Sequence, residues 1–205
     1  GPDTLNIDIE AVLVAIRRER PNAILPVHLF GRPQDVGPLR EAAEEIEAYV
    51  IEDVAQAFGA NVGKNYAGTV GHIGCFSFFP TKNLGAFGQG GLAVTGDPAL
   101  ANRMRRLREP IVHGEVESFT TNARLDALQA AVLRTKLPHV AGWNEQRRQV
   151  ARHYDELFGS IREVTVPGPD SGHVYHQYVI RAEQRDELMR ALHAADIESR
   201  VYYDH

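Results

Sequence analysis

The sequence has little of what several classes of protein require. Its single cysteine, Cys75, excludes an internal disulfide framework and fits a reducing compartment such as the cytoplasm. No apolar run is long enough to span a bilayer. The net charge of -5 gives no basic surface for nucleic acid, and the nine histidines show no metal-ligand spacing. We therefore expect a cytoplasmic protein with no metal, membrane or nucleic-acid partner.

What is present is an ordinary globular composition. The chain has 205 residues, of which 43% are hydrophobic and 24% charged, and this supplies enough apolar side chains for a buried core. The length allows one large domain, or one domain and part of a second.

Short apolar runs alternate with amphipathic stretches through the first half of the chain. Strands are expected at residues 23–30, 49–54, 75–79 and 92–95, and helices at 8–17, 35–47 and 97–108. Near-continuous apolar strands separated by helices are typical of an α/β layer with a mostly parallel sheet. The first half therefore predicts the sheet domain.

After Pro110 the pattern changes to that of a smaller α+β unit. Helices are expected at 124–137, 140–158 and 184–195, and strands at 174–180 and 197–203. We expect residues 1–140 to be part of a large cofactor-binding domain and residues 141–205 part of a small C-terminal domain.

Four side chains suited to holding pyridoxal phosphate occur in order along the chain. An acid and an amide, Asp53 and Gln56, follow an apolar run, and Ser77 precedes Lys82 by five positions. With this cofactor, a lysine amine binds covalently, an acid pairs with the ring nitrogen, and small polar groups hold the ring oxygen and the phosphate. The constellation predicts a pyridoxal-phosphate site with Lys82 at its centre.

The motifs around these residues resemble one family. Glu52–Gln56 is similar to the acid-amide signature of that family, and Phe76–Asn83 is similar to its lysine motif. Further along the chain, Gly88–Gly91 is similar to its glycine turn and Thr121–Leu125 to its Asn-x-Arg segment. On these residues the chain resembles the DegT/DnrJ/EryC1/StrS family of sugar aminotransferases, which have the type I pyridoxal-phosphate transferase fold.

The resemblance implies a role for each matched residue. Lys82 would bind the cofactor covalently and move protons, and Asp53 would keep the ring nitrogen protonated. Gln56 would donate to the ring oxygen, and Ser77 would bind the phosphate. Asn122 would reach the phosphate of the neighbouring subunit, because the active site in this family is shared across a homodimer.

The implied activity is transfer of an amino group from an amino acid, with glutamate the expected donor, to a nucleotide-linked keto-deoxysugar for amino-deoxysugar and antibiotic biosynthesis. A family dehydratase is one alternative, but those enzymes resemble this chain with histidine in place of the lysine, so Lys82 argues against it. A non-catalytic truncated homologue that acts as a binding or regulatory module is another.

The family's N-terminal segment, which carries a Gly-Thr phosphate cup at a helix start, has no counterpart in this sequence. Helix N-terminal amides are a main part of phosphate binding. We therefore expect an incomplete chain that binds the cofactor weakly by itself.

Several of these residues also have structural interpretations. Ser77 could be a hydrogen-bonded sheet serine, and Asn122 could cap a helix. His28 in an apolar run is interpreted as a core histidine and Cys75 as an inert thiol. Arg124 is interpreted as an ion-pair partner.

Overall fold

The computed structural model describes residues 4–109 and 121–203. Its main sheet has four strands in the order β1 (Ala23–Ile24), β2 (Tyr49–Asp53), β5 (Ile73–Ser77) and β6 (Gly91–Val94). The pairs β1–β2 and β2–β5 are parallel, whereas β6 runs antiparallel to β5. The predicted α/β class with a mostly parallel sheet is confirmed.

Two small antiparallel pairs lie outside this sheet. They are formed by β3 (Asn61–Val62) with β4 (Asn65–Tyr66), and by β7 (Val164–Thr165) with β8 (Arg181–Ala182).

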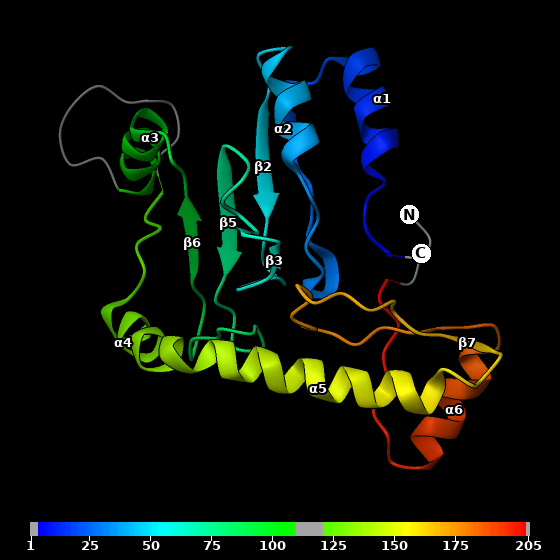
Figure 1. Ribbon diagram of the computed structural model, residues 1–205. Helices are drawn as coiled ribbons and strands as arrows, with labels where there is room; N and C mark the ends of the chain where they lie inside the picture. The colour runs from blue at the N-terminus through cyan, green and yellow to red at the C-terminus, as the bar shows by residue number, and fades with distance from the viewer. Residues whose placement is uncertain (1–3, 110–120, 204–205) are drawn as a thin grey trace.

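Helices make up most of the remaining regular structure in the described residues. They are α1 (Ile9–Glu19), α2 (Gly37–Glu44), α3 (Pro98–Arg108), α4 (Ala127–Lys136), α5 (Val140–Phe158) and α6 (Arg185–Ala194), with short 3-10 turns at Leu29–Gly31 and Leu137–His139. Helices α1 and α2 pack against each other, and α2 packs on β1 and β2. Figure 1 shows α5 crossing the end of the sheet toward which the arrows of β2 and β5 point.

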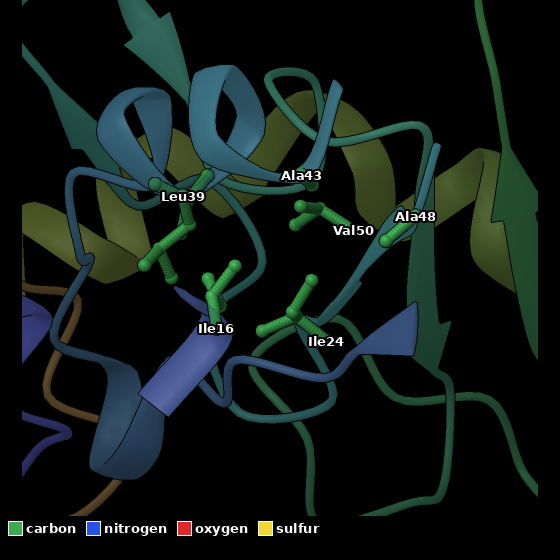
Figure 2. Packing of buried hydrophobic residues seen from close by; sticks show 7 residues of the cluster. Ile16, Ile24, Leu39, Ala43, Ala48 and Val50 are labelled. Carbon is green, nitrogen blue, oxygen red and sulfur yellow. The ribbon is translucent and has the colours of Figure 1, made fainter. Parts of the chain in front are cut away.

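The largest apolar cluster joins the first two helices to the sheet. Ile16 of α1 and Leu39 of α2 meet Ile24 and Val50 from the strands, as Figure 2 shows. Leu39 and Val50 are completely buried. Burying a side chain of this size contributes about 1.5–3 kcal/mol, so this cluster stabilises the packing of α1 and α2 on the sheet.

Two aspartates start helices where the sequence predicts them. Asp8 accepts a hydrogen bond from Ala11 N at 3.1 Å, and Asp97 accepts one from Ala99 N at 2.7 Å. Each bond satisfies an amide that has no partner within its helix. Pro98 follows Asp97 in the first turn of α3, where its missing N–H costs nothing.

The strand predicted at 23–30 is wrong beyond its first residues. Pro26 has no N–H to donate to the ladder, and Phe30 has a φ of 60°, which turns the chain into the 3-10 segment. Pairing with β2 persists only locally, since Asp53 N donates to Pro26 O at 2.9 Å and His28 N donates to Asp53 O at 3.0 Å.

The strands predicted at 174–180 and 197–203 are also wrong, because the described residues in both ranges are irregular. Tyr175 has a φ of 42°, which interrupts an extended chain in the first range, and Asp196, with a φ of 57°, lies immediately before the second. Val174 N donates instead to Gly31 O at 3.0 Å, so this segment packs on the 3-10 turn.

Other predicted bounds shift by a few residues. Strand β5 begins earlier, at Ile73; α2 ends earlier, at Glu44; and α4 begins later, at Ala127.

Candidate active site

Asp53 and Ser77 stand at the ends of two neighbouring parallel strands. Asp53 is the last residue of β2 and Ser77 the last of β5, and the register pairs Asp53 with Cys75. Carboxyl ends of parallel strands share one edge of the sheet, where open α/β sheets bind their ligands. The structure therefore brings these two predicted site residues together.

A cavity of about 230 Å³ opens between these strand ends, lined by Asp53, Cys75 and Ser77 among others. Asp53 Oδ1 accepts a hydrogen bond from Ala55 N at 2.9 Å, which orients the carboxylate. Ser77 Oγ accepts one from Phe79 N at 3.3 Å. The hydroxyl proton of Ser77 is not used in that bond, so it is available to a ligand.

Cys75 lies beside these groups as an unreactive thiol. Burial raises its pKa, and the charge of Asp53 raises the pKa further. The thiol therefore stays protonated at neutral pH, in agreement with the predicted inert cysteine.

The turn that follows β1 fixes Gln56. Its Oε1 accepts a hydrogen bond from Phe30 N at 2.6 Å. Its Nε2 lies 3.5 Å from the hydroxyl of Tyr203, at the outer limit of a hydrogen bond. Because the amide oxygen is engaged, the amide N–H is the group that Gln56 can offer to a ligand.

Lys82 lies in the turn after β5. Strand β5 ends at Ser77, and in the turn that follows Lys82 N donates to Phe79 O at 2.9 Å. Gly85 closes the turn, where a Cβ would lie 2.4 Å from Pro80 O. The Lys82 side chain is half-buried, and its Nζ makes no hydrogen bond or ion pair with any described residue. An amine so placed can act as a nucleophile.

A buried amide network holds the lysine turn in place. Asn83, only 6% exposed, donates from Nδ2 to Asn144 Oδ1 at 2.8 Å and to Val174 O at 3.1 Å. Its Oδ1 lies 3.1 Å from His176 Nδ1. Since the Asn83 oxygen can only accept, this nitrogen of His176 carries the proton. The network ties the backbone beside Lys82 to α5 and to the 174–176 segment.

His176 is a residue of this region that sequence reasoning did not single out. Burial, together with the charges of Lys82 and Arg147, lowers its pKa to about 4. With Arg147 it lines a second cavity, of about 490 Å³. The alternating pattern of residues 174–180 predicted a strand, and such a pattern indicates only which side chains are packed in the core. It therefore gave no sign that His176 lies near Lys82. The buried Asn83 beside Lys82 was likewise not found, and no local pattern marks it.

The structure does not bring Asn122 to the other predicted site residues. Asn122 is exposed, and no described contact joins it to Lys82 or Asp53. The cap interpretation is wrong, because α4 begins after Asp126. Arg124 forms an ion pair with Glu109 at 3.4 Å, as predicted.

Two searches of the described ranges, 4–109 and 121–203, bear on other classes of site. No group of three or more His, Cys, Asp or Glu side chains is placed to hold a metal ion there. No helix in those ranges has both the length and the apolar character needed to cross a membrane.

The parallel sheet, the acid and hydroxyl at its strand ends and the lysine turn define a fold of the pyridoxal-phosphate transferase type. The DegT/DnrJ/EryC1/StrS aminotransferase family matches residues 1–205, and the chain belongs to this family.

Named relatives are similar over most of this chain. It is 42% identical over 191 residues to a UDP-N-acetyl-3-dehydro-alpha-D-glucosamine 3-aminotransferase of Acidithiobacillus ferrooxidans, covering 90% of this chain and 51% of that protein. It is 41% identical to a dTDP-3-amino-3,4,6-trideoxy-alpha-D-glucose transaminase of Streptomyces venezuelae, covering 90% and 50%.

Among solved structures, DesV of S. venezuelae in complex with a ketimine intermediate is 40% identical, with a TM-score of 0.88 over 97% of this chain and 54% of that one. The chain spans about half the length of the curated relatives it matches.

Proposed function

We propose that the protein is a pyridoxal-phosphate-dependent aminotransferase that places an amino group on C3 of a nucleotide-linked keto-sugar, with glutamate as the donor. The observation that carries the proposal is Lys82, a half-buried amine with no counter-ion among the described residues, in the turn that follows the strand ending at Ser77. Two relatives at 42% and 41% identity are named for amination at C3 of UDP- and dTDP-linked sugars.

The described side chains fit the cofactor by the chemistry of their polar atoms. Asp53 offers a carboxylate and Ser77 a hydroxyl at one cavity. Gln56 offers an amide N–H because Phe30 N occupies its oxygen. These are the acid, hydroxyl and amide that pyridoxal phosphate requires around its ring and phosphate.

In the proposed mechanism each residue has a separate task. When bound, pyridoxal phosphate supplies an electron sink for charge that develops on the substrate carbon. Lys82 Nζ holds the cofactor covalently between turnovers, and as a free amine it takes a proton from the substrate and returns it. Asp53 retains a proton on the ring nitrogen by charge pairing. Gln56 Nε2 and Ser77 Oγ donate to the ring oxygen and the phosphate.

The proposal includes the quaternary structure and the domain division. Two copies form a homodimer in which Asn122 of one subunit reaches the phosphate of the other. Residues 1–140 belong to the large domain and 141–205 to the small domain, with α5 beginning at Val140 supporting this division. A single cysteine and nucleotide-linked substrates support action in the cytoplasm.

Neither alternative function is favoured by a specific observation. A dehydratase of this family is expected to have histidine at position 82, where this chain has lysine. A non-catalytic role would leave the polar groups around the Asp53–Ser77 cavity without a use.

The test is a transamination screen of the full-length protein with glutamate and UDP- or dTDP-linked 3-keto and 4-keto sugars. We expect turnover with a 3-keto sugar and none in Lys82→Ala. Turnover of 4-keto sugars alone would refute the C3 assignment, and no turnover with any keto-sugar would refute the sugar assignment.

A further inference from the structure

A buried carboxylate lies immediately before Asp53 and has no part in the mechanism above. Glu52 is 0% exposed. Its Oε2 accepts hydrogen bonds from Gly68 N at 2.7 Å and from His28 Nε2 at 2.8 Å. Its Oε1 accepts from Val70 N at 2.9 Å and from Gly71 N. All four partners are donors, so the group is bound as a carboxylate.

His28 completes this arrangement as a neutral donor. Gln34 N donates to His28 Nδ1 at 2.9 Å, so the ring proton must be on Nε2, which faces Glu52. His28 is also 0% exposed, and its backbone N donates to Asp53 O at 3.0 Å. This pair agrees with the prediction that His28 is a satisfied core histidine.

The hydrogen bonds favour the ionised state of Glu52 despite its burial. Burial by itself raises the pKa of the carboxyl, but the bonds from His28, Gly71 and Gly68 outweigh it, and the pKa is lowered overall. The charge therefore persists at neutral pH inside the fold.

The loop that Glu52 binds is shaped to approach it closely. Gly68 has a φ of 86°, and a Cβ there would lie 2.5 Å from the ring of Phe76. A Cβ at Gly71 would lie 3.1 Å from the Glu52 side chain. Glycine at both positions lets the backbone amides reach the carboxylate.

Glu52 and His28 connect the three segments that carry the candidate cofactor groups. Strand β2 ends at Asp53, the 68–71 loop leads directly into β5 and Ser77, and the turn around Phe30 holds Gln56 at 2.6 Å. Because successive strand residues face opposite sides of a sheet, Glu52 points away from the side that Asp53 presents.

We propose that Glu52 and His28 are positioning residues that fix Asp53, Gln56 and Ser77 relative to one another for cofactor binding. This inference rests on the proposed function. Replacing a buried charge and its polar partners by apolar residues of similar volume is often neutral or stabilising for a fold. A carboxylate with four directed donors instead imposes one geometry on the loop, the turn and the strand.

The test compares two substitutions of similar size in the full-length protein. His28→Met removes the donor to Glu52, whereas His28→Gln places an amide N–H where Nε2 lies. Loss of a residue that orients a metal ligand commonly costs about 10–100-fold in metal affinity. By analogy, we expect His28→Met to weaken pyridoxal-phosphate binding by at least about tenfold. We expect His28→Gln to restore most of that loss.

Leu39→Ala is the control for stability alone, because Leu39 is equally buried but lies in the cluster between α1, α2 and the sheet. It should lower the melting temperature and leave cofactor affinity unchanged. The proposal is overturned if His28→Met binds the cofactor no more weakly than Leu39→Ala does. It is also overturned if His28→Met and His28→Gln bind the cofactor with the same affinity.

Amide hydrogen exchange gives a readout that needs no cofactor. We expect His28→Met and Glu52→Gln to lose protection at Gly68, Val70 and Gly71 while α5 keeps its protection. Unchanged protection in the loop contradicts the positioning role. Absence of cofactor binding by the unsubstituted protein would instead refute the proposed function, so the two failures are distinguishable.

Discussion

At the scale of single residues, the fold holds His173 in its neutral form. The side chain is 2% exposed, its Nδ1 accepts a hydrogen bond from Tyr175 N at 2.9 Å, and its ring stacks on that of Tyr175. Burial and the charge of Arg32 lower its pKa to about 3. Burial likewise lowers the pKa of His176, to about 4.

These histidines predict acid sensitivity. Below the ordinary histidine pKa of about 6.5, the unfolded chain binds protons that the folded protein does not, so stability falls as the pH drops from 6.5 toward about 3. One such group lowers the free energy of unfolding by about 1.4 kcal/mol per pH unit in this window. Urea unfolding across the window should show a shallower slope in His173→Phe.

The control is His153→Asn, since the His153 side chain is 69% exposed. Its slope should match that of the unsubstituted protein. Glu52 does not contribute to the pH dependence of stability above pH 4.5. Its pKa is lowered from that value, so the stability it contributes is lost only in stronger acid. Equal slopes in His173→Phe and the unsubstituted protein would contradict this account.

At the scale of elements, α5 is coupled to the lysine turn through Asn83 and Asn144. Removing one amide leaves buried polar partners unsatisfied, which costs about 1–3 kcal/mol. We expect Asn83→Ala and Asn144→Ala each to destabilise the fold, and the double variant to lose less than their sum by about 1 kcal/mol. Denaturant unfolding of the four proteins measures this coupling.

Additive losses would show that the hydrogen bond at 2.8 Å does not connect the two elements energetically. Asn102→Ala with Asn144→Ala is a suitable control pair, because Asn102 lies on the exposed face of α3. That pair should be additive.

The elements that could be predicted from the sequence are those with local signals. Helix α3 begins at the Asp97–Pro98 start signal, and α5 occupies the predicted range 140–158. The segment 174–180 alternates like a strand but bonds to the 3-10 turn near Gly31, and that contact is set by tertiary packing. Alternation of apolar and polar residues indicates which side chains are buried, but it does not indicate which segment the backbone hydrogen-bonds to.

The candidate site was predictable to the same extent. Asp53 and Ser77 end adjacent parallel strands, so their convergence follows from the expected sheet. The support of Lys82 does not, because Asn83 binds Asn144 and Val174, which are 61 and 91 positions away. The partners of Glu52 also lie on separate segments, and no spacing rule connects them.

At the scale of the whole molecule, the proposed shared active site predicts complementation between subunits. A mixed dimer of Lys82→Ala and Asn122→Ala would have one site with both changes and one with neither. When equal amounts of the two variants are dissociated and reassociated at random, half of the dimers are mixed. About a quarter of all active sites should then contain both Lys82 and Asn122, and activity should recover to about that fraction. Activity no higher than the sum of the separate variants would refute the role of Asn122 across the interface.

Borohydride reduction followed by peptide mass analysis tests directly whether Lys82 binds pyridoxal phosphate covalently. The chain has three lysines, and Lys64→Ala is a matched control because Lys64 is exposed in the β3–β4 turn. In the full-length protein we predict a cofactor adduct on the peptide containing Lys82, unchanged in Lys64→Ala and absent in Lys82→Ala. An adduct on another lysine, or one that persists in Lys82→Ala, would contradict the account.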